Sequence, residues 1–226
     1  MNAVLRRRLE MAVRVRDFLR AHKTDGVGDG TAIAKFEELV DRAELLTAQQ
    51  RAGAVATKSA AMQRGQLRRA LQTKLLKYLA AVGAVAVKEN PELGAQFQPP
   101  HASTSTLSFL TAARAMLEKA TAQKDLLVSH GMSEKLLDDL AATLGEFEQT
   151  LEASRTGRRD QVGASADLDA VIADITDQLR LVDGLVRYRF GDDAELMGAW
   201  ASARNVLGPF KAKAAPEVPP GQVAAA

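Results

Sequence analysis

The stretch RDFLRAH at residues 16–22 returns as KDLLVSH at residues 124–130. The two copies are 108 positions apart, and further along the chain the shift becomes 104, so that Gly53 aligns with Gly157. In this register apolar residues fall on apolar residues: Ile33 on Leu137, Phe36 on Leu140, Val40 on Leu144, Leu67 on Val171, Leu71 on Ile175, Leu75 on Leu179, Tyr78 on Val182 and Val82 on Val186. Internal repeats of this kind indicate duplicated structural units.

The composition indicates that these units are helical. Ala, Leu, Arg, Glu and Gln, which are good helix formers, dominate the chain, and only 4% of the residues are aromatic. Runs of sheet-forming residues are scarce. We therefore expect an all-α protein whose core is built from Leu, Val, Ile and Ala.

Apolar residues at steps of three and four predict helices over residues 2–21, 31–88, 105–129 and 133–189, with a short helix after Asp193. Three glycines between residues 24 and 30 end the first helix, and Pro91 ends the second, because the residue before a proline avoids helical geometry. Gly131 follows the third helix, as glycine often does just past a helix end. The fold predicted is an antiparallel helical bundle made of two tandem, structurally similar helical-hairpin units with long helices.

Two interpretations of the long segments remain open. The apolar stripe fades around Gly53 and around Gly157, so each segment is either one long helix or a helical hairpin that bends there. We favour continuous helices, because a chain reversal normally carries stronger turn signals than glycine alone.

The predicted domain organisation follows the repeat. Residues 1–98 form the first unit and residues 99–210 the second, packed together as one bundle, and a linker rich in Pro, Ser and Thr joins them. Residues 211–226, which are rich in Ala, Pro and Val, are predicted to be a disordered tail.

Composition also bears on the environment of the protein. The chain has no cysteine, which excludes disulfides, thiolate nucleophiles and Cys-based metal sites. The arginines at residues 6–8 are not followed by the apolar run of about 7–15 residues that a secretory signal needs. No stretch reaches the ~20 apolar residues of a membrane-spanning helix. We expect a soluble cytoplasmic protein.

The equivalent histidines of the repeat are candidate metal ligands. His22 and His130 each follow an aspartate, Asp17 or Asp125, by five residues. If the two units packed around a pseudo-twofold axis, the four side chains would form a plausible transition-metal ligand set. We favour instead a capping role, because a histidine in a last helical turn interacts well with free carbonyls and with the helix dipole.

Enzymatic signatures are weak. The sequence contains no Glu-x-x-His pair, no His-Glu-x-x-His motif, no phosphate-binding loop and no dinucleotide fingerprint. The chain has no cysteine and three scattered histidines, so few of its residues could form a catalytic nucleophile–base pair. The sequence thus predicts neither an enzyme nor a cofactor. Trp200 and a few aromatic residues near the ends of the units are expected to form a small aromatic plug, with a binding pocket there as the alternative.

Charge is distributed unevenly. Residues 45–88 contain no Asp or Glu and eight cations, among them seven candidate polyanion-binding residues: Arg51, Lys58, Arg64, Arg68, Arg69, Lys74 and Lys77. Such a segment is typical of contact with a phosphate backbone. The matching part of the second unit is acidic, with Asp167, Asp169, Asp174, Asp177 and Asp183. We favour internal charge pairing between the two segments over nucleic-acid binding.

Taken together, these observations predict a non-catalytic helical structural or protein-interaction module with protein partners or self-association. Polyanion or nucleic-acid binding through residues 45–88 and a ligand- or metal-binding bundle are the alternatives. Elongated helical faces offer surface for partners rather than a pocket, which is why the first hypothesis is preferred.

Overall fold

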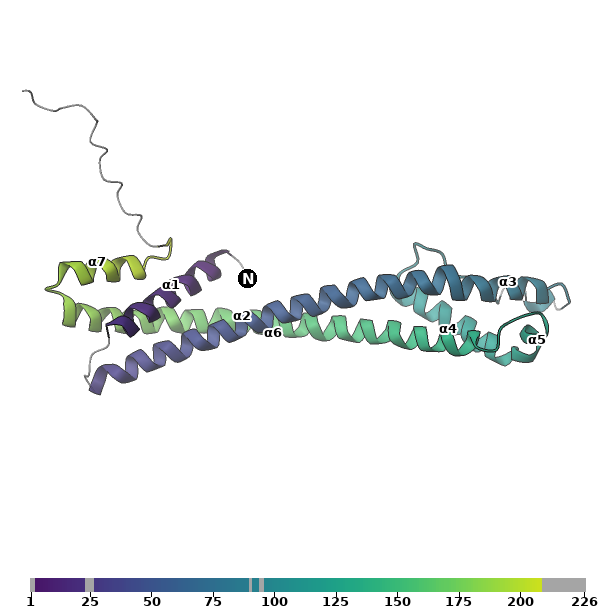
Figure 1. The fold of residues 1–226 in the computed structure, drawn as a ribbon, viewed down its shortest axis with the longest axis horizontal. Helices are drawn as coiled ribbons and strands as arrows, with labels where there is room; N and C mark the ends of the chain where they lie inside the picture. The colour runs from purple at the N-terminus through teal and green to yellow at the C-terminus, as the bar shows by residue number, and fades with distance from the viewer. Residues whose placement is uncertain (1–2, 23–26, 90, 94–95, 209–226) are drawn as a thin grey trace, which may run out of the picture. The chain divides into compact units, whose positions relative to one another are not determined.

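The structure is a computed structural model that describes residues 3–22, 27–89, 91–93 and 96–208. Secondary structure in these residues is helical, without strands (Figure 1). The predicted all-α class is therefore confirmed. The predicted tail at 211–226 lies outside the described residues.

Two long helical segments dominate the chain. Helix α2 (Val27–Ala70) continues through one π-helical turn, η1 (Leu71–Leu75), directly into α3 (Leu76–Ala86). Helix α6 (Leu136–Phe190) is uninterrupted over 55 residues. Neither segment breaks at its central glycines, so the continuous-helix prediction holds. Helix α2 also begins earlier than predicted, since Gly28 and Gly30 lie inside it.

The shorter helices are α1 (Ala3–Ala21), a 3-10 turn η2 (Pro91–Leu93), α4 (Thr106–Ala122), α5 (Lys124–Ser129) and α7 (Ala194–Ala203). Helix α4 begins where the Ser105 hydroxyl accepts a hydrogen bond from the Ser108 amide at 3.2 Å. Helix α5 ends at His130, and Gly131 has a positive φ of 94° that an L side chain rarely adopts. The predicted glycine end of this helix is confirmed.

The Cα positions divide the chain into two compact units. Unit 1 comprises residues 1–50 and 163–226, and unit 2 comprises residues 51–162. These boundaries differ from the predicted repeats at 1–98 and 99–210, because each compact unit takes part of both repeats. The tandem duplication thus stays a prediction.

In unit 1, α1 and α7 pack with the first part of α2 and the last part of α6 (Figure 1). The core includes Val15, Phe36, Val40, Leu168, Ile172, Ile175 and Trp200, all at most 3% exposed. Arg16 ties α1 to α2, because its Nη1 donates to Asp41 at 2.8 Å and to Glu44 at 2.7 Å.

In unit 2, α3, α4, α5 and the first part of α6 enclose a second core. Its fully buried members include Leu71, Leu76, Leu79, Phe109, Leu127, Leu140 and Phe147. Phe109 and Phe147 lie against each other with ring centroids 5.7 Å apart.

Helices α2 and α6 approach each other closely in unit 2 at Gly53 and Gly157. A Cβ atom on Gly53 would lie 2.6 Å from the Gly157 carbonyl oxygen, and a Cβ on Gly157 would lie 2.9 Å from the Gly53 oxygen. Only residues without a side chain allow the two backbones to come this close. The glycines that align in the sequence repeat therefore meet in space.

The π-helical turn changes which leucines enter the core. One extra residue in a turn rotates every following side chain around the helix axis. Leu71 and Leu76 are consequently fully buried, whereas Leu75, which the three-and-four spacing predicts in the core, is only half-buried.

Leu76→Ala should therefore lower the free energy of unfolding by about 2 kcal/mol or more, because it leaves a cavity in a fully buried site. Leu75→Ala should have a clearly smaller effect. Urea unfolding of both variants tests the register. A larger loss for Leu75→Ala than for Leu76→Ala would show that the π-helical turn is misplaced.

Candidate functional site

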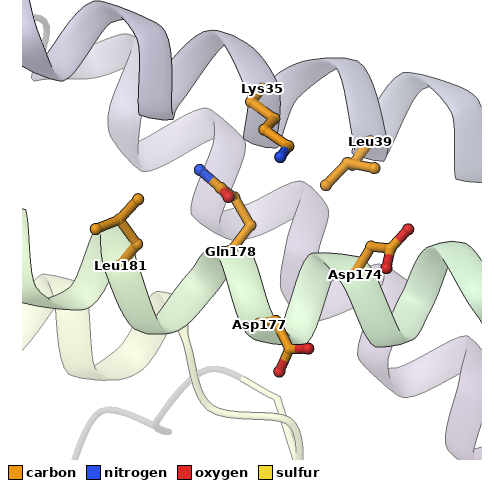
Figure 2. A pocket seen from close by; sticks show the side chains of 6 residues that line it. All are labelled: Lys35, Leu39, Asp174, Asp177, Gln178 and Leu181. Carbon is orange, nitrogen blue, oxygen red and sulfur yellow. The ribbon is translucent and has the colours of Figure 1, made fainter.

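An open groove of about 410 Å³ lies between α2 and α6 in unit 1. Figure 2 shows its lining, with Lys35 and Leu39 from α2 and Asp174, Asp177, Gln178 and Leu181 from α6. The Gln178 side chain donates to the Ala32 carbonyl at 2.9 Å, and Asp177 pairs with Arg180 at 2.8 Å. The lining thus combines one cation, two carboxylates and an amide with two leucine side chains.

Two further hollows are small and mostly apolar. One in unit 1 holds only about 10 Å³ beside His22 and Phe190. The other, in unit 2, holds about 260 Å³ beside Gly83, Leu93 and Phe97. Neither brings together several polar groups, which a small-molecule site normally uses to orient its ligand.

The candidate metal ligands are placed in different compact units. In unit 1, the His22 ring packs against the Phe18 ring at a tilt of 48°, with centroids 4.6 Å apart, while Asp17 lies 4.0 Å from Arg16 Nε. In unit 2, His130 caps α5 and its Nε2 lies 3.3 Å from a Glu89 oxygen, whereas Asp125 is in the first turn of α5. The described part of the chain contains no group of three His, Asp or Glu side chains that could hold a metal ion.

All seven candidate polyanion-binding residues belong to unit 2. Arg68 makes contacts within the fold. Its guanidinium donates hydrogen bonds to the carbonyls of Ala102 and Thr104 and lies 4.7 Å from the centroid of the Phe109 ring. Arg69 donates to the Gly65 carbonyl at 3.3 Å within its own helix.

The remaining five candidates are Arg51, Lys58, Arg64, Lys74 and Lys77, and among the described residues of unit 2 none of them forms an ion pair. The acidic residues Asp177 and Asp183 pair with arginines of their own unit, Arg180, Arg187 and Arg204. The predicted internal pairing of the basic and acidic segments remains a prediction.

The outward face of α2 carries a feature that the sequence analysis missed. Val55 is 62% exposed and Met62 is 59% exposed. Ala52 and Ser59, which complete the same series at steps of three and four, are exposed as well. In the sequence these residues form a second periodic stripe beside the one that enters the core.

Asp183 organises the C-terminal end of unit 1. Its Oδ1 accepts hydrogen bonds from Trp200 Nε1 at 2.7 Å and Arg204 Nη1 at 2.9 Å, and its Oδ2 accepts one from Arg187 Nε at 2.9 Å. Burial disfavours the charged carboxylate, but the hydrogen bonds from Trp200 and Arg187 and the charges of both arginines outweigh it. The pKa of Asp183 is thereby lowered.

The lowered pKa predicts a pH-dependent contribution to stability. It is complete above the ordinary aspartate pKa of 3.8 and is lost as the pH falls through the lower folded-state pKa. Asp183→Asn should cost ~1.5–3 kcal/mol at neutral pH, with a smaller difference from the unmodified chain near pH 3. Urea unfolding at both pH values measures this. An equal difference in unfolding free energy between the two chains at both pH values would contradict the pH-dependent contribution of Asp183.

Comparison with family models, curated proteins and solved structures gives no match to this chain. No helix in the described ranges is both long enough and apolar enough to span a bilayer. In its described residues the protein is all-helical, with two long helical segments, an open groove in unit 1 and two smaller cavities.

Proposed function

We propose that this chain is a non-catalytic helical structural or protein-interaction module that works through protein partners or self-association. The observation that carries the proposal is the exposure of large apolar side chains on the long helices. Val55 and Met62 of α2 and Val162 and Leu181 of α6 are each at least 55% exposed. Val55 and Met62 lie seven residues apart, two turns along one face of α2, and contiguous exposed apolar patches mark sites of protein–protein interaction.

The groove at Lys35 and Asp174 supports the same proposal. It is open, it combines apolar and charged residues, and its lining comes from two helices rather than from catalytic loops. Binding surfaces for protein helices commonly combine an apolar floor with a charged rim.

The experiment is affinity purification of the full chain from its native cells, followed by reconstitution with purified components. We expect one or a few proteins to co-purify in stoichiometric amounts and to bind again in isolation, or the chain to associate with itself in sedimentation velocity runs. A chain that stays monomeric at all concentrations and binds none of the co-purified proteins would overturn the proposal.

We also propose that the chain arose by tandem duplication of a helical-hairpin unit, with one long helical segment in each copy. The mutual contact of Gly53 and Gly157 supports this origin, since the two residues align in the repeat. Two antiparallel copies related by a pseudo-twofold axis meet at equivalent positions.

A second candidate function is polyanion binding through unit 2. Five cations that have no carboxylate partner among the described residues of unit 2, in a segment that lacks acidic residues from 45 to 88, favour it. Charge reversal at Arg64, Lys74 and Lys77 should weaken binding to a DNA duplex at low salt, and binding should fall steeply as salt is raised. Arg68 is unsuitable for this test because it supports the fold. Undetectable binding of the unmodified chain to DNA or RNA at low salt would end this candidate.

A further inference from the structure

We infer that the outward face of α2 between Arg51 and Gln63 binds an amphipathic helix of a partner protein that carries carboxylates along one edge of its apolar stripe. The inference rests on the proposed function and adds the place of binding and the chemistry of the partner. It concerns one continuous stretch of α2 within unit 2.

The stripe has the spacing of a coiled-coil seam. Ala52, Val55, Ser59 and Met62 recur at steps of three, four and three residues, and all four are exposed. In heptad terms Ala52 and Ser59 take one core position, and Val55 and Met62 take the other.

This seam is separate from the face that packs inside unit 2. Gly53 and Ala60 face inward, since Gly53 contacts the backbone of α6 and Ala60 is 6% exposed. At about 100° per residue, Val55 lies roughly 200° around the helix from Gly53, and Met62 the same angle from Ala60. Helix α2 therefore has two apolar faces, and its partner inside the unit uses only one of them.

Charge along the seam selects the partner. Arg51 and Lys58 are seven residues apart, each directly before a core position, so they line one edge of the seam. Both are exposed, and neither forms an ion pair within the described residues of unit 2. The opposite edge carries the uncharged Ala56 and Gln63. Carboxylates on a docked helix would neutralise the cationic edge, as edge charges do in coiled coils.

The same charges disfavour a second copy of this chain as the occupant. In an antiparallel pair, edge positions of one kind face each other, so Arg51 and Lys58 would meet their own counterparts. In a parallel pair they would face Ala56 and Gln63, which offer no opposite charge. A nucleic acid would use the cations but would leave Val55 and Met62 exposed to water.

The test uses the full chain and two synthetic 28-residue helical peptides. Both carry Leu and Val at the core heptad positions, and the edge positions are Glu in one peptide and Lys in the other. We expect the Glu peptide to bind at least about tenfold more tightly than the Lys peptide in fluorescence anisotropy. Arg51→Glu with Lys58→Glu should invert this order.

One neutral double variant separates seam binding from simple charge attraction. Val55→Asn with Met62→Gln should weaken binding of the Glu peptide by at least about tenfold, while circular dichroism and the melting temperature stay unchanged. A Glu peptide that binds no better than the Lys peptide would overturn the inference. So would a DNA duplex that binds more tightly than the Glu peptide and is insensitive to these two substitutions.

The proteins that co-purify with the chain distinguish the proposed function from the inference about the α2 face. If a purified partner binds the Val55→Asn, Met62→Gln chain as tightly as the unmodified chain, the inference fails and the proposed function stands. If the Glu peptide binds as expected but no cellular protein binds the chain, the proposed function fails by its own test.

Discussion

Replacement of Trp200 by alanine should lower the free energy of unfolding by ~3–5 kcal/mol, the range for removing a buried aromatic side chain. Trp200 is fully buried, its ring centroid lies 5.2 Å from that of Phe18, and its indole N–H donates to Asp183. The substitution therefore removes the main contact by which α7 joins the unit 1 core and leaves one hydrogen bond of Asp183 unmade.

Trp200→Phe provides the matched control for this prediction. It keeps an aromatic ring in the core but loses the hydrogen bond to Asp183 and part of the buried ring volume, so its cost should be about 1–3 kcal/mol, less than that of Trp200→Ala. Chemical unfolding followed by circular dichroism measures both variants. Equal stability of Trp200→Ala and the unmodified chain would show that α7 does not pack on α1.

Gly53→Ala should cost about 3 kcal/mol, the upper end of the range for overpacked sites. The new Cβ would lie 2.6 Å from the Gly157 oxygen and 2.9 Å from the Gln161 nitrogen. Both are backbone atoms, so no rotation of a side chain relieves the clash and the helices must separate.

Gly65→Ala on the same helix is the control, because a Cβ there meets no atom within 4 Å. It should leave stability unchanged or raise it by up to about 1 kcal/mol, since alanine is the better helix former. Thermal unfolding of the two variants side by side tests the close approach. A Gly53→Ala chain as stable as Gly65→Ala would refute it.

Much of the fold follows from periodicity. The lack of turn signals stronger than glycine between residues 31 and 88 favoured one long helix, and the structure is helical from Val27 to Ala86. The π-helical turn at Leu71–Leu75 could not be predicted, because the apolar series Leu67, Leu71, Leu75 is what an unbroken α-helix would show. The division into compact units was also inaccessible, since spacing within a helix does not state which parts of two long helices pack with which short helix.

The candidate sites were less predictable than the fold. The charge distribution of the sequence identified the basic segment. It could not show that Arg68 donates hydrogen bonds to the carbonyls of Ala102 and Thr104. These contacts join positions more than thirty residues apart. The alignment of His22 with His130 suggested a shared ligand set. In the structure, however, the His22 ring contacts Phe18 and the His130 ring lies beside Glu89.

The proposed function requires that protein partners cover the exposed apolar positions on the long helices. A photoreactive amino acid placed at Met62 or Leu181, both more than half exposed, tests it in living cells, with the exposed polar Glu118 as the reference position. We predict covalent protein adducts of defined mass at Met62 or Leu181 that are absent at Glu118. Equal labelling at all three positions, or adducts to nucleic acid alone, would contradict the claim.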